Sequence, residues 1–197
     1  MVKLTRAIQP LLLPFNSLQN NPTWRRLYFA EMVSLLGDTF TWVGIALLAY
    51  AFGGISQAAT ILAIALTLRV TAFIIFSPIA GVIADRLDRK KILYITHIFR
   101  TVIVGLLPFV TLVWQIYLLI FLLNIFNAFF TPTFQAVIPQ VVVRKENYAS
   151  AIGLYNATYQ LLGVLGPGLA GVFAAWLGAR EVFFVDALSF IIAAILI

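Results

Sequence analysis

Four ionisable residues stand inside otherwise apolar stretches of the sequence. Glu31 and Asp38 are seven residues apart, so on a helix their carboxyl groups share one face. Arg69 and Arg100 each interrupt a further apolar run. A charged side chain within a membrane costs about 2.5 to 3.5 kcal/mol on insertion scales, so each of these residues needs a partner or a water-filled cavity. Carboxyl groups in such a partly dry place can take up and release protons near neutral pH.

The two carboxyl groups have alternative partners. Glu31 follows Arg25 and Arg26 closely, and a local ion pair and a proton-binding role both stay open for it. For Asp38, which lies deeper, we expect a functional role. Arg69 is expected at a similar depth on the next helix, so Asp38 and Arg69 are predicted to pair, either as a gate or as a static stabiliser.

Two more charged residues have expected structural roles. Arg100 lies some two turns into its apolar run, where it can reach Asp85 or extend its guanidinium to the membrane interface. Asp186 stands near the start of the last apolar run and is expected to cap a helix or pair with Arg180. No catalytic role is predicted for either.

Side-chain amides gather on the apolar run 116–137. Asn124 and Asn127 are followed there by Thr131 and Gln135, which offer further hydrogen bonds. We expect Asn124 and Asn127, together with Glu31, Asp38 and Arg69, to line a cavity for protons and substrate. Amides suit a neutral amphipathic compound, and the phenylalanines between them fit either bundle core or a stacking surface.

Composition excludes an ordinary soluble domain. The 197 residues are 62% hydrophobic and only 10% charged, which leaves too little polar surface to cover a globule. The net charge of +6 resides mostly in short loops, as membrane topology requires, so no nucleic-acid partner is predicted. With no cysteine, one histidine, no metal-ligand spacing and no phosphate-binding glycine loop, the sequence predicts neither an enzyme nor a cofactor or metal.

The apolar runs predict an all-α, polytopic membrane helix bundle with six transmembrane helices. They lie at about 27–50, 57–84, 92–113, 116–137, 149–177 and 182–197. Short turns are expected at 52–56 and near 114–115, and the last run, of about 16 residues, is shorter than a full crossing. Residues 1–23 are predicted to form a cytoplasmic tail and residues 24–197 the bundle, with the sixth helix truncated.

Basic residues set the predicted orientation. Lys and Arg concentrate in the tail and in the connections after the second and fourth runs, the latter with Arg144 and Lys145, whereas the opposite turns contain only Arg180. Because cytoplasmic loops are enriched in Lys and Arg, we expect a multi-pass protein of the plasma or inner cell membrane with a cytoplasmic N-terminus.

The connection after the second run is the densest cluster of charge in the chain. It reads Gly-Val-Ile-Ala-Asp-Arg-Leu-Asp-Arg-Lys-Lys-Ile-Leu over residues 81–93. Membrane topology alone explains Lys and Arg in this connection, but it does not require a glycine or an aspartate at fixed positions. Asp85 can pair with an arginine or accept hydrogen bonds from a neighbouring helix N-terminus, and such a contact can latch one conformation.

This loop resembles the signature loop of the major facilitator superfamily, roughly G-x-L-A-D-R-x-G-R-K-x-x-L. The residues on that pattern are Gly81, Ala84, Asp85, Arg86, Arg89, Lys90 and Leu93. Asp88 replaces the usual glycine, as is typical of the branch resembling macrolide and siderophore exporters. The resemblance implies a conformational latch formed by Gly81, Asp85, Arg86, Arg89 and Lys90.

A glycine-rich stretch in the fifth run has a second resemblance. Gly163, Gly166, Pro167 and Gly171 suit close helix packing and a bend, because small residues admit neighbouring backbones and proline removes a hydrogen bond. The stretch is similar to the G-x-x-x-G-P-x-x-G-G element of superfamily exporters, with Ala170 in place of one glycine. Packing alone also explains it.

The resemblance implies the N-terminal half of a twelve-helix fold whose two six-helix halves rock about a site at the membrane midplane. It implies a secondary transporter that exports hydrophobic or amphipathic small molecules in exchange for protons. The fourth run lacks the intramembrane arginine of many proton-coupled members, which puts their usual route in doubt. Lysophospholipid or siderophore transport and a transport-inactive remnant are alternatives. The expected partners are the lipid bilayer, the substrate, and either a missing C-terminal six-helix half or a second copy.

Overall fold

The structure, a computed structural model, describes residue 18 and residues 21–142 and 145–197, with side chains from 148 onward in the last range. The predicted tail therefore falls almost wholly outside the described residues, as does Arg144. All regular structure in the described ranges is helical, which confirms the predicted all-α class. The elements are α2 (Pro22–Arg86), α3 (Arg89–Leu106), the 3₁₀ turn η1 (Leu107–Phe109), α4 (Val113–Val141), α5 (Lys145–Leu177) and α6 (Val182–Leu196).

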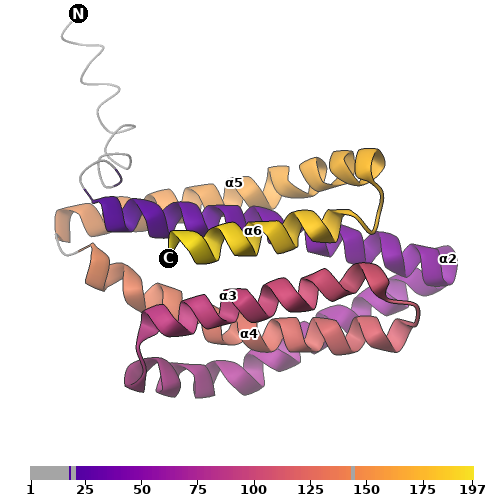
Figure 1. Ribbon diagram of the computed structural model, residues 1–197, viewed down its shortest axis with the longest axis horizontal. Coiled ribbons are helices and arrows are strands. Elements are labelled where there is room, and N and C mark those ends of the chain that lie inside the picture. Colours follow the sequence, from indigo (N-terminus) through magenta and orange to yellow (C-terminus); the bar gives the residue numbers. More distant parts are fainter. Residues whose placement is uncertain (1–17, 19–20, 143–144) are drawn as a thin grey trace, which may run out of the picture.

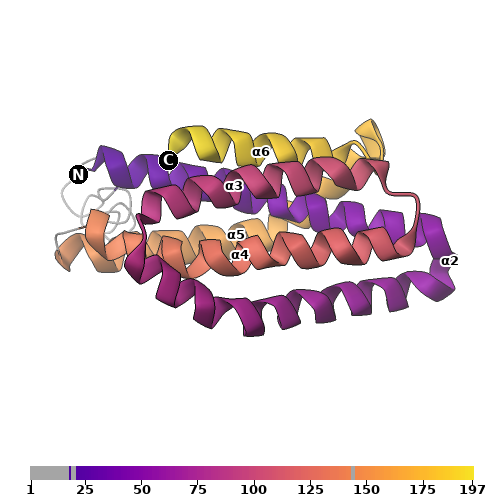
Figure 2. The same ribbon diagram turned by 60° about the horizontal axis from the view of Figure 1, so that its bottom comes forward.

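Helix α2 is two helices joined at one glycine. Its 65 residues would measure about 98 Å if straight, more than three times the hydrocarbon core of a bilayer. Gly54 has φ 59° and ψ −165°, a conformation almost confined to glycine, and there the chain doubles back (Figure 2). The turn predicted at 52–56 is thus confirmed. We call residues 22–53 the first limb and residues 55–86 the second limb.

The turn between α3 and α4 lies earlier than predicted. Trp114 and Gln115 belong to the first turn of α4, and the reversal occurs at 110–112. The Gln115 side-chain oxygen accepts hydrogen bonds from the backbone N–H groups of Thr111 and Leu112, at 2.9 and 3.0 Å. These two donors would otherwise lack partners, so the glutamine starts the helix that we expected it to precede.

The helices lie lengthwise beside one another (Figure 1), and the chain runs up and down through them. Helix α2 packs against α4, α5 and α6, and α3 packs against α4 and α6. Apolar side chains from all these helices fill the interior, the largest cluster including Ile45, Ile116, Phe183 and Phe190. The core therefore follows the long axis of the bundle.

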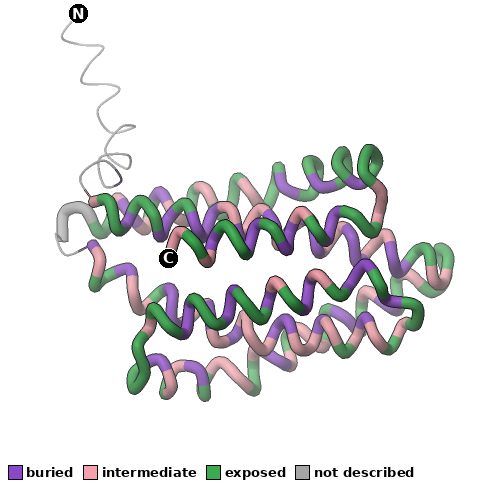
Figure 3. Tube along the Cα trace, viewed as in Figure 1, coloured by how far each residue is buried: buried purple, intermediate pink, exposed green. Residues whose placement is uncertain are grey.

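The outer faces are apolar along most of their length. Exposed residues follow the outward side of each helix (Figure 3), and many are large and hydrophobic, among them Ile98, Val102 and Trp176. Within the described residues, α2, Arg89–Phe109, α4 and Tyr148–Leu177 are long and apolar enough to cross a membrane, and α6 is a shorter apolar helix. A bilayer is the surrounding that such faces suit.

Candidate functional site

An ion pair joins the first limb of α2 to α3. The Arg100 guanidinium lies 2.8 Å from the Asp38 carboxylate, and the Arg100 side chain is 2% exposed against 25% for Asp38. The guanidinium carbon also lies 3.9 Å from the centroid of the Phe190 ring and 5.2 Å from that of Phe130. Two aromatic faces and a carboxylate thus stabilise this buried cation.

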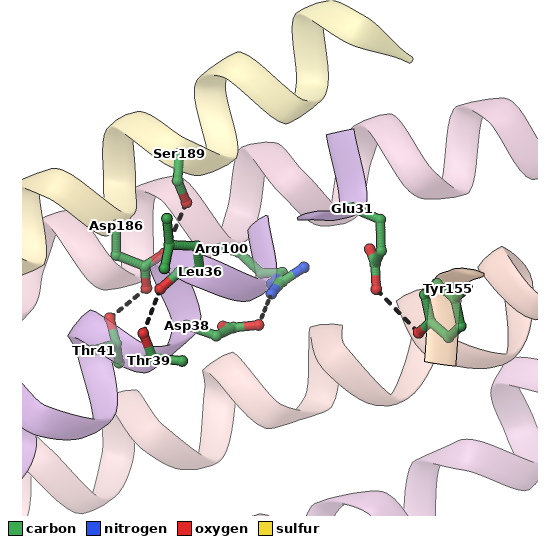
Figure 4. A network of polar contacts seen from close by, with 9 residues as sticks. All are labelled: Glu31, Leu36, Asp38, Thr39, Thr41, Arg100, Tyr155, Asp186 and Ser189. Atoms are coloured by element: carbon green, nitrogen blue, oxygen red, sulfur yellow. Dashed lines mark hydrogen bonds and ion pairs between the residues drawn. The ribbon is translucent and has the colours of Figure 1, made fainter. Parts of the chain in front are cut away.

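Two predictions about these charges were wrong. Asp38 does not pair with Arg69, because Arg100 already occupies its carboxylate (Figure 4). Arg100 neither reaches Asp85 nor extends to the interface, because its guanidinium is enclosed between helices. The Asp38 carboxylate of the first limb is therefore neutralised by an arginine of α3 and not by an arginine of the second limb.

Glu31 lies two turns before Asp38 and is buried, 5% exposed. The Tyr155 hydroxyl of α5 donates a long hydrogen bond of 3.5 Å to Glu31 Oε1 (Figure 4). Among the described residues, Glu31 Oε2 has no hydrogen-bond partner. The alternative of a local ion pair is wrong, since Arg25 and Arg26 are exposed and the Glu31 carboxyl group points into the bundle.

Arg69, on the second limb, rests on an aromatic ring. Its guanidinium carbon lies 5.1 Å from the centroid of the Trp42 ring, which belongs to the first limb. No carboxylate of the described residues lies within 4 Å of the Arg69 guanidinium nitrogens. The side chain is half-buried, so its charge faces the space between the two limbs.

Asp186 joins the first limb of α2 to α6. Its carboxyl group accepts hydrogen bonds from Thr41 and from Ser189 (Figure 4). Gly37 is the residue that lets the two helices meet here, because a Cβ atom at that position would overlap Asp186 and Ser189. The predicted pair with Arg180 was wrong, since that guanidinium donates a hydrogen bond to the carbonyl oxygen of Pro108 instead, at 2.7 Å.

A cavity of about 430 Å³ lies between the two limbs of α2, α4 and α5. It contains Asp38, Arg69 and Asn127, and a smaller adjoining hollow of about 220 Å³ adds Glu31 and Arg100. Four of the five residues predicted to form a cavity thus line the smaller hollow together, and three of the four also line the larger cavity. The fifth, Asn124, is buried within the bundle and donates its amide to the Ile120 carbonyl of its own helix, at 2.8 Å.

The signature loop lies at the end of the bundle, beside a cavity of about 670 Å³. Asp85, at the end of α2, forms an ion pair of 3.5 Å with Arg89, the first residue of α3, and the Asp85 side chain is 77% exposed. Arg89 also donates to the Ala136 carbonyl oxygen of α4, at 2.8 Å. The contact between helices at this loop therefore comes from Arg89, while Arg86 and Lys90 are exposed.

The rest of the loop serves local structure. The Asp88 carboxylate accepts the backbone N–H of Lys90 at 3.0 Å and so caps the start of α3. Gly81 has no neighbouring atom within 4 Å of a Cβ built on it, so close packing does not require glycine there. The latch role of this loop stays a prediction.

The glycine stretch of α5 packs closely at one position. A Cβ atom on Gly166 would lie 2.6 Å from Thr39 Cγ2 of the first limb, whereas Gly163 and Gly171 have no neighbour within 4 Å. Gly163 and Pro167 line the 430 Å³ cavity, and α5 is continuous through Pro167. The stretch thus shapes a cavity wall more than it forms a packing seam.

Sequence reasoning missed several side chains of this site. Trp42 contacts Arg69, and Tyr155 contacts Glu31. Tyr159 lines both hollows. Trp42 follows Asp38 by four residues, and so shares its helical face. That spacing was a usable signal, whereas nothing in the sequence links Tyr155 to Glu31 on a different helix.

Fold and site together define a polytopic membrane helix bundle with a charged internal cavity. The sequence profile of the Major Facilitator Superfamily matches residues 27–197. The chain therefore belongs to this superfamily, as its signature loop predicted. The relatives that it matches are named as transporters and efflux pumps, not as enzymes.

Three relatives illustrate the similarity. The chain is 28% identical over 180 residues to the uncharacterized MFS-type transporter YkuC of Bacillus subtilis (strain 168), covering 90% of this chain and 41% of that protein. It is 34% identical over 145 residues to the multi-drug resistance efflux pump PmrA of Streptococcus pneumoniae serotype 4, covering 73% and 35%. To macrolide efflux protein A of Streptococcus pyogenes it is 27% identical over 142 residues, covering 70% and 35%. The chain thus spans between 35% and 41% of the length of these three relatives.

Proposed function

We propose that this chain forms one six-helix wall of a secondary transporter that exports hydrophobic or amphipathic compounds, driven by proton movement. The observation that carries the proposal is Glu31, a buried carboxyl group beside the Asp38–Arg100 pair, one oxygen of which has no hydrogen-bond partner in the described part of the chain. The efflux function named for two of the relatives supports the direction of transport.

Glu31 suits a proton-binding role better than Asp38. Burying an ionised carboxyl group without a cationic partner is costly, and a bound proton removes that cost. Among the described residues no ion pair reaches Glu31, whereas Asp38 already has its cation in Arg100. Loss of a proton from Glu31 would place a second negative charge near Arg100, which lines the same hollow. Arg100 would then be shared between two carboxylates, and the helices that hold them would shift.

The cavity needs a second wall. Asp38, Arg69 and Asn127 line a hollow that is only partly enclosed, and lipid chains are a poor surrounding for them. A second six-helix unit or a second copy of this chain would cover these groups and complete a site at the midplane. The basic residues support a cytoplasmic end, since the start of α2, which contains Arg25 and Arg26, lies at the same end of the bundle as the signature loop (Figure 1).

Efflux of the neutral dye Nile red from energised cells tests this function. We would compare the chain alone, the chain co-expressed with the unmatched remainder of PmrA, and the Glu31→Gln and Asp38→Asn variants of the active form. Asp186→Asn is the matched control, because it also removes a buried carboxyl group but lies outside the cavity. We expect proton-driven efflux that Glu31→Gln abolishes and Asp186→Asn retains.

The outcomes separate the alternatives. Activity of the chain alone would indicate that a second copy supplies the other wall. Efflux that survives both Glu31→Gln and Asp38→Asn would refute proton linkage through this site. Absence of efflux from every form, with the protein present in the membrane, would favour a transport-inactive remnant.

A further inference from the structure

We infer that the cavity binds an anionic amphiphile, a compound with a carboxylate, sulfonate or phosphate group on an apolar body, and that Arg69 holds the anionic group. This inference rests on the proposed function, whose substrate class it specifies. It differs from the neutral compound that the amides of α4 suggested.

The first step concerns the balance of charge in the cavity. Of the four charged residues that line the two hollows, Asp38 and Arg100 neutralise each other at 2.8 Å. Glu31 lines only the smaller hollow, where among the described residues its hydrogen-bond partner is the Tyr155 hydroxyl. The charged residues that line the larger hollow are Asp38 and Arg69, so the guanidinium of Arg69 is the charge that remains there and the larger hollow is net positive.

The second step concerns what Arg69 lacks. Its contact with Trp42 covers one face of the guanidinium plane, and no described carboxylate satisfies its N–H groups. A guanidinium that is held by its face keeps its edge free, and that edge has the fork of donors which pairs with carboxylate, sulfonate or phosphate oxygens. Asn127 lies in the same wall and adds an amide donor.

The third step concerns the rest of the lining. Around Arg69 the larger hollow is mostly apolar, with Trp42, Val43, Ala46 and Leu162 along it. Its volume of about 430 Å³ is within the usual range for small-molecule sites. An apolar body would lie against these side chains while its anionic group reaches Arg69. A cationic amphiphile would meet the unpaired guanidinium at the same place and be repelled.

Two matched dyes test the inference without any transport. Anilinonaphthalene sulfonate and N-phenyl-1-naphthylamine share one ring system, but only the first has an anionic group. We would titrate each into the full chain in phosphatidylcholine nanodiscs and subtract empty nanodiscs. The variants are Arg69→Gln, Arg69→Lys and, as the control, Arg25→Gln, which removes an exposed arginine outside both hollows.

We expect the sulfonate dye to bind the unaltered chain more tightly than the neutral dye. Arg69→Gln should weaken the binding of the sulfonate dye about tenfold to a hundredfold, the range for losing a hydrogen bond to a charged group. Arg69→Lys should retain most of the binding, Arg25→Gln should leave it unchanged, and the neutral dye should bind all forms alike. A competition experiment separates two sources of the anionic group. Displacement of the sulfonate dye by lysophosphatidylglycerol would point to a lipid as the natural ligand, whereas failure of this lipid to displace the dye would point to a free aromatic anion. Both results support the anion site.

Equal binding of the two dyes, or an Arg69→Gln effect no larger than that of Arg25→Gln, would overturn the inference. If the Arg69→Gln variant also fails to bind the neutral dye, the Arg69→Lys variant becomes the deciding test. Failure of Arg69→Lys to bind the sulfonate dye would then overturn the inference as well. Failure of the proposed function looks different. A chain that binds the sulfonate dye through Arg69 but exports neither that dye nor Nile red keeps its anion site and loses its transport role.

Discussion

At the scale of single residues, the chain handles its intramembrane charges in three ways. Arg100 is enclosed and compensated by Asp38 and two aromatic rings, although its buried Nε has no hydrogen-bond partner among the described residues. Glu31 is enclosed and almost uncompensated, and Arg69 is half-exposed with only a ring beneath it. Because a lone charge is costly in a membrane, we assign the compensated residue a structural role, and the proposals above assign the other two to protons and ligands.

The stability of the detergent-solubilised chain tests the structural role of the pair. Asp38→Asn leaves the Arg100 guanidinium buried without a counter-ion, which costs about 3 to 5 kcal/mol for a fully buried pair. Since Asp38 is a quarter exposed, we expect a loss of about 1 to 3 kcal/mol, seen as a lower unfolding temperature by tryptophan fluorescence. Adding Arg100→Gln should recover part of the loss, because the double variant has no unpaired charge. A double variant less stable than Asp38→Asn would show that Arg100 acts mainly through the phenylalanines.

Residue types and depths could be predicted from the sequence, but partners could not. Glu31, Asp38, Arg69 and Asn127 were expected in one cavity, since hydropathy gives depth and the helical period gives the face. Arg100 was missed as the partner of Asp38, because both arginines lie at a suitable depth and only the packing of α3 against the bundle chooses between them. Asn124 and Asn127 differ by three residues, close to one helical turn, and the sequence could not show which of them faces the cavity.

At the scale of helices, boundaries followed from apolar runs and local hydrogen bonding. The reversal at Gly54 was predictable, because two consecutive glycines stand there in a stretch without charged residues. The start of α4 was not, because it depends on hydrogen bonds of the Gln115 side chain, which do not appear in the hydropathy of the sequence. Contacts between helices depend on single small residues. At Gly37 the first limb of α2 meets α6, with Ser189 Cβ only 2.7 Å from the place of a Cβ atom.

Gly37→Ala should therefore destabilise the bundle more than an alanine elsewhere. The added methyl group overlaps Ser189 and Asp186, so α6 must move and the Asp186 hydrogen bonds must stretch, at a cost of about 1 to 3 kcal/mol. Gly168→Ala is the matched control, because no atom lies within 4 Å and alanine is the better helix former by about 1 kcal/mol. Unfolding temperatures of both variants give the comparison, and equal temperatures would contradict the close contact of α2 with α6.

At the scale of the whole molecule, the bundle has two kinds of surface. The outward faces of α3 and α6 are apolar, with residues such as Val102 and Ile195 exposed. The space between the limbs of α2, α4 and α5 has charged and amide side chains instead. One molecule thus presents an apolar surface that suits lipid and a polar surface, to which the proposed function assigns water, substrate and a second wall. This division was expected of a half of a twelve-helix fold.

Single cysteines can map this division directly, because the chain has no cysteine of its own. Ala46 lines the 430 Å³ cavity, and Val102 is exposed on the outward face of α3. A membrane-impermeant maleimide reacts with a thiolate, which forms readily in water and hardly at all in lipid. In membrane vesicles we therefore expect Ala46→Cys to be labelled and Val102→Cys to stay unlabelled until detergent is added.

Labelling of Ala46→Cys should slow when the second wall is co-expressed, since that wall would narrow the opening. If Ala46→Cys resisted the reagent in vesicles and Val102→Cys accepted it, the faces assigned to lipid and to water would have to be exchanged, and the cavity would no longer be a path for substrate.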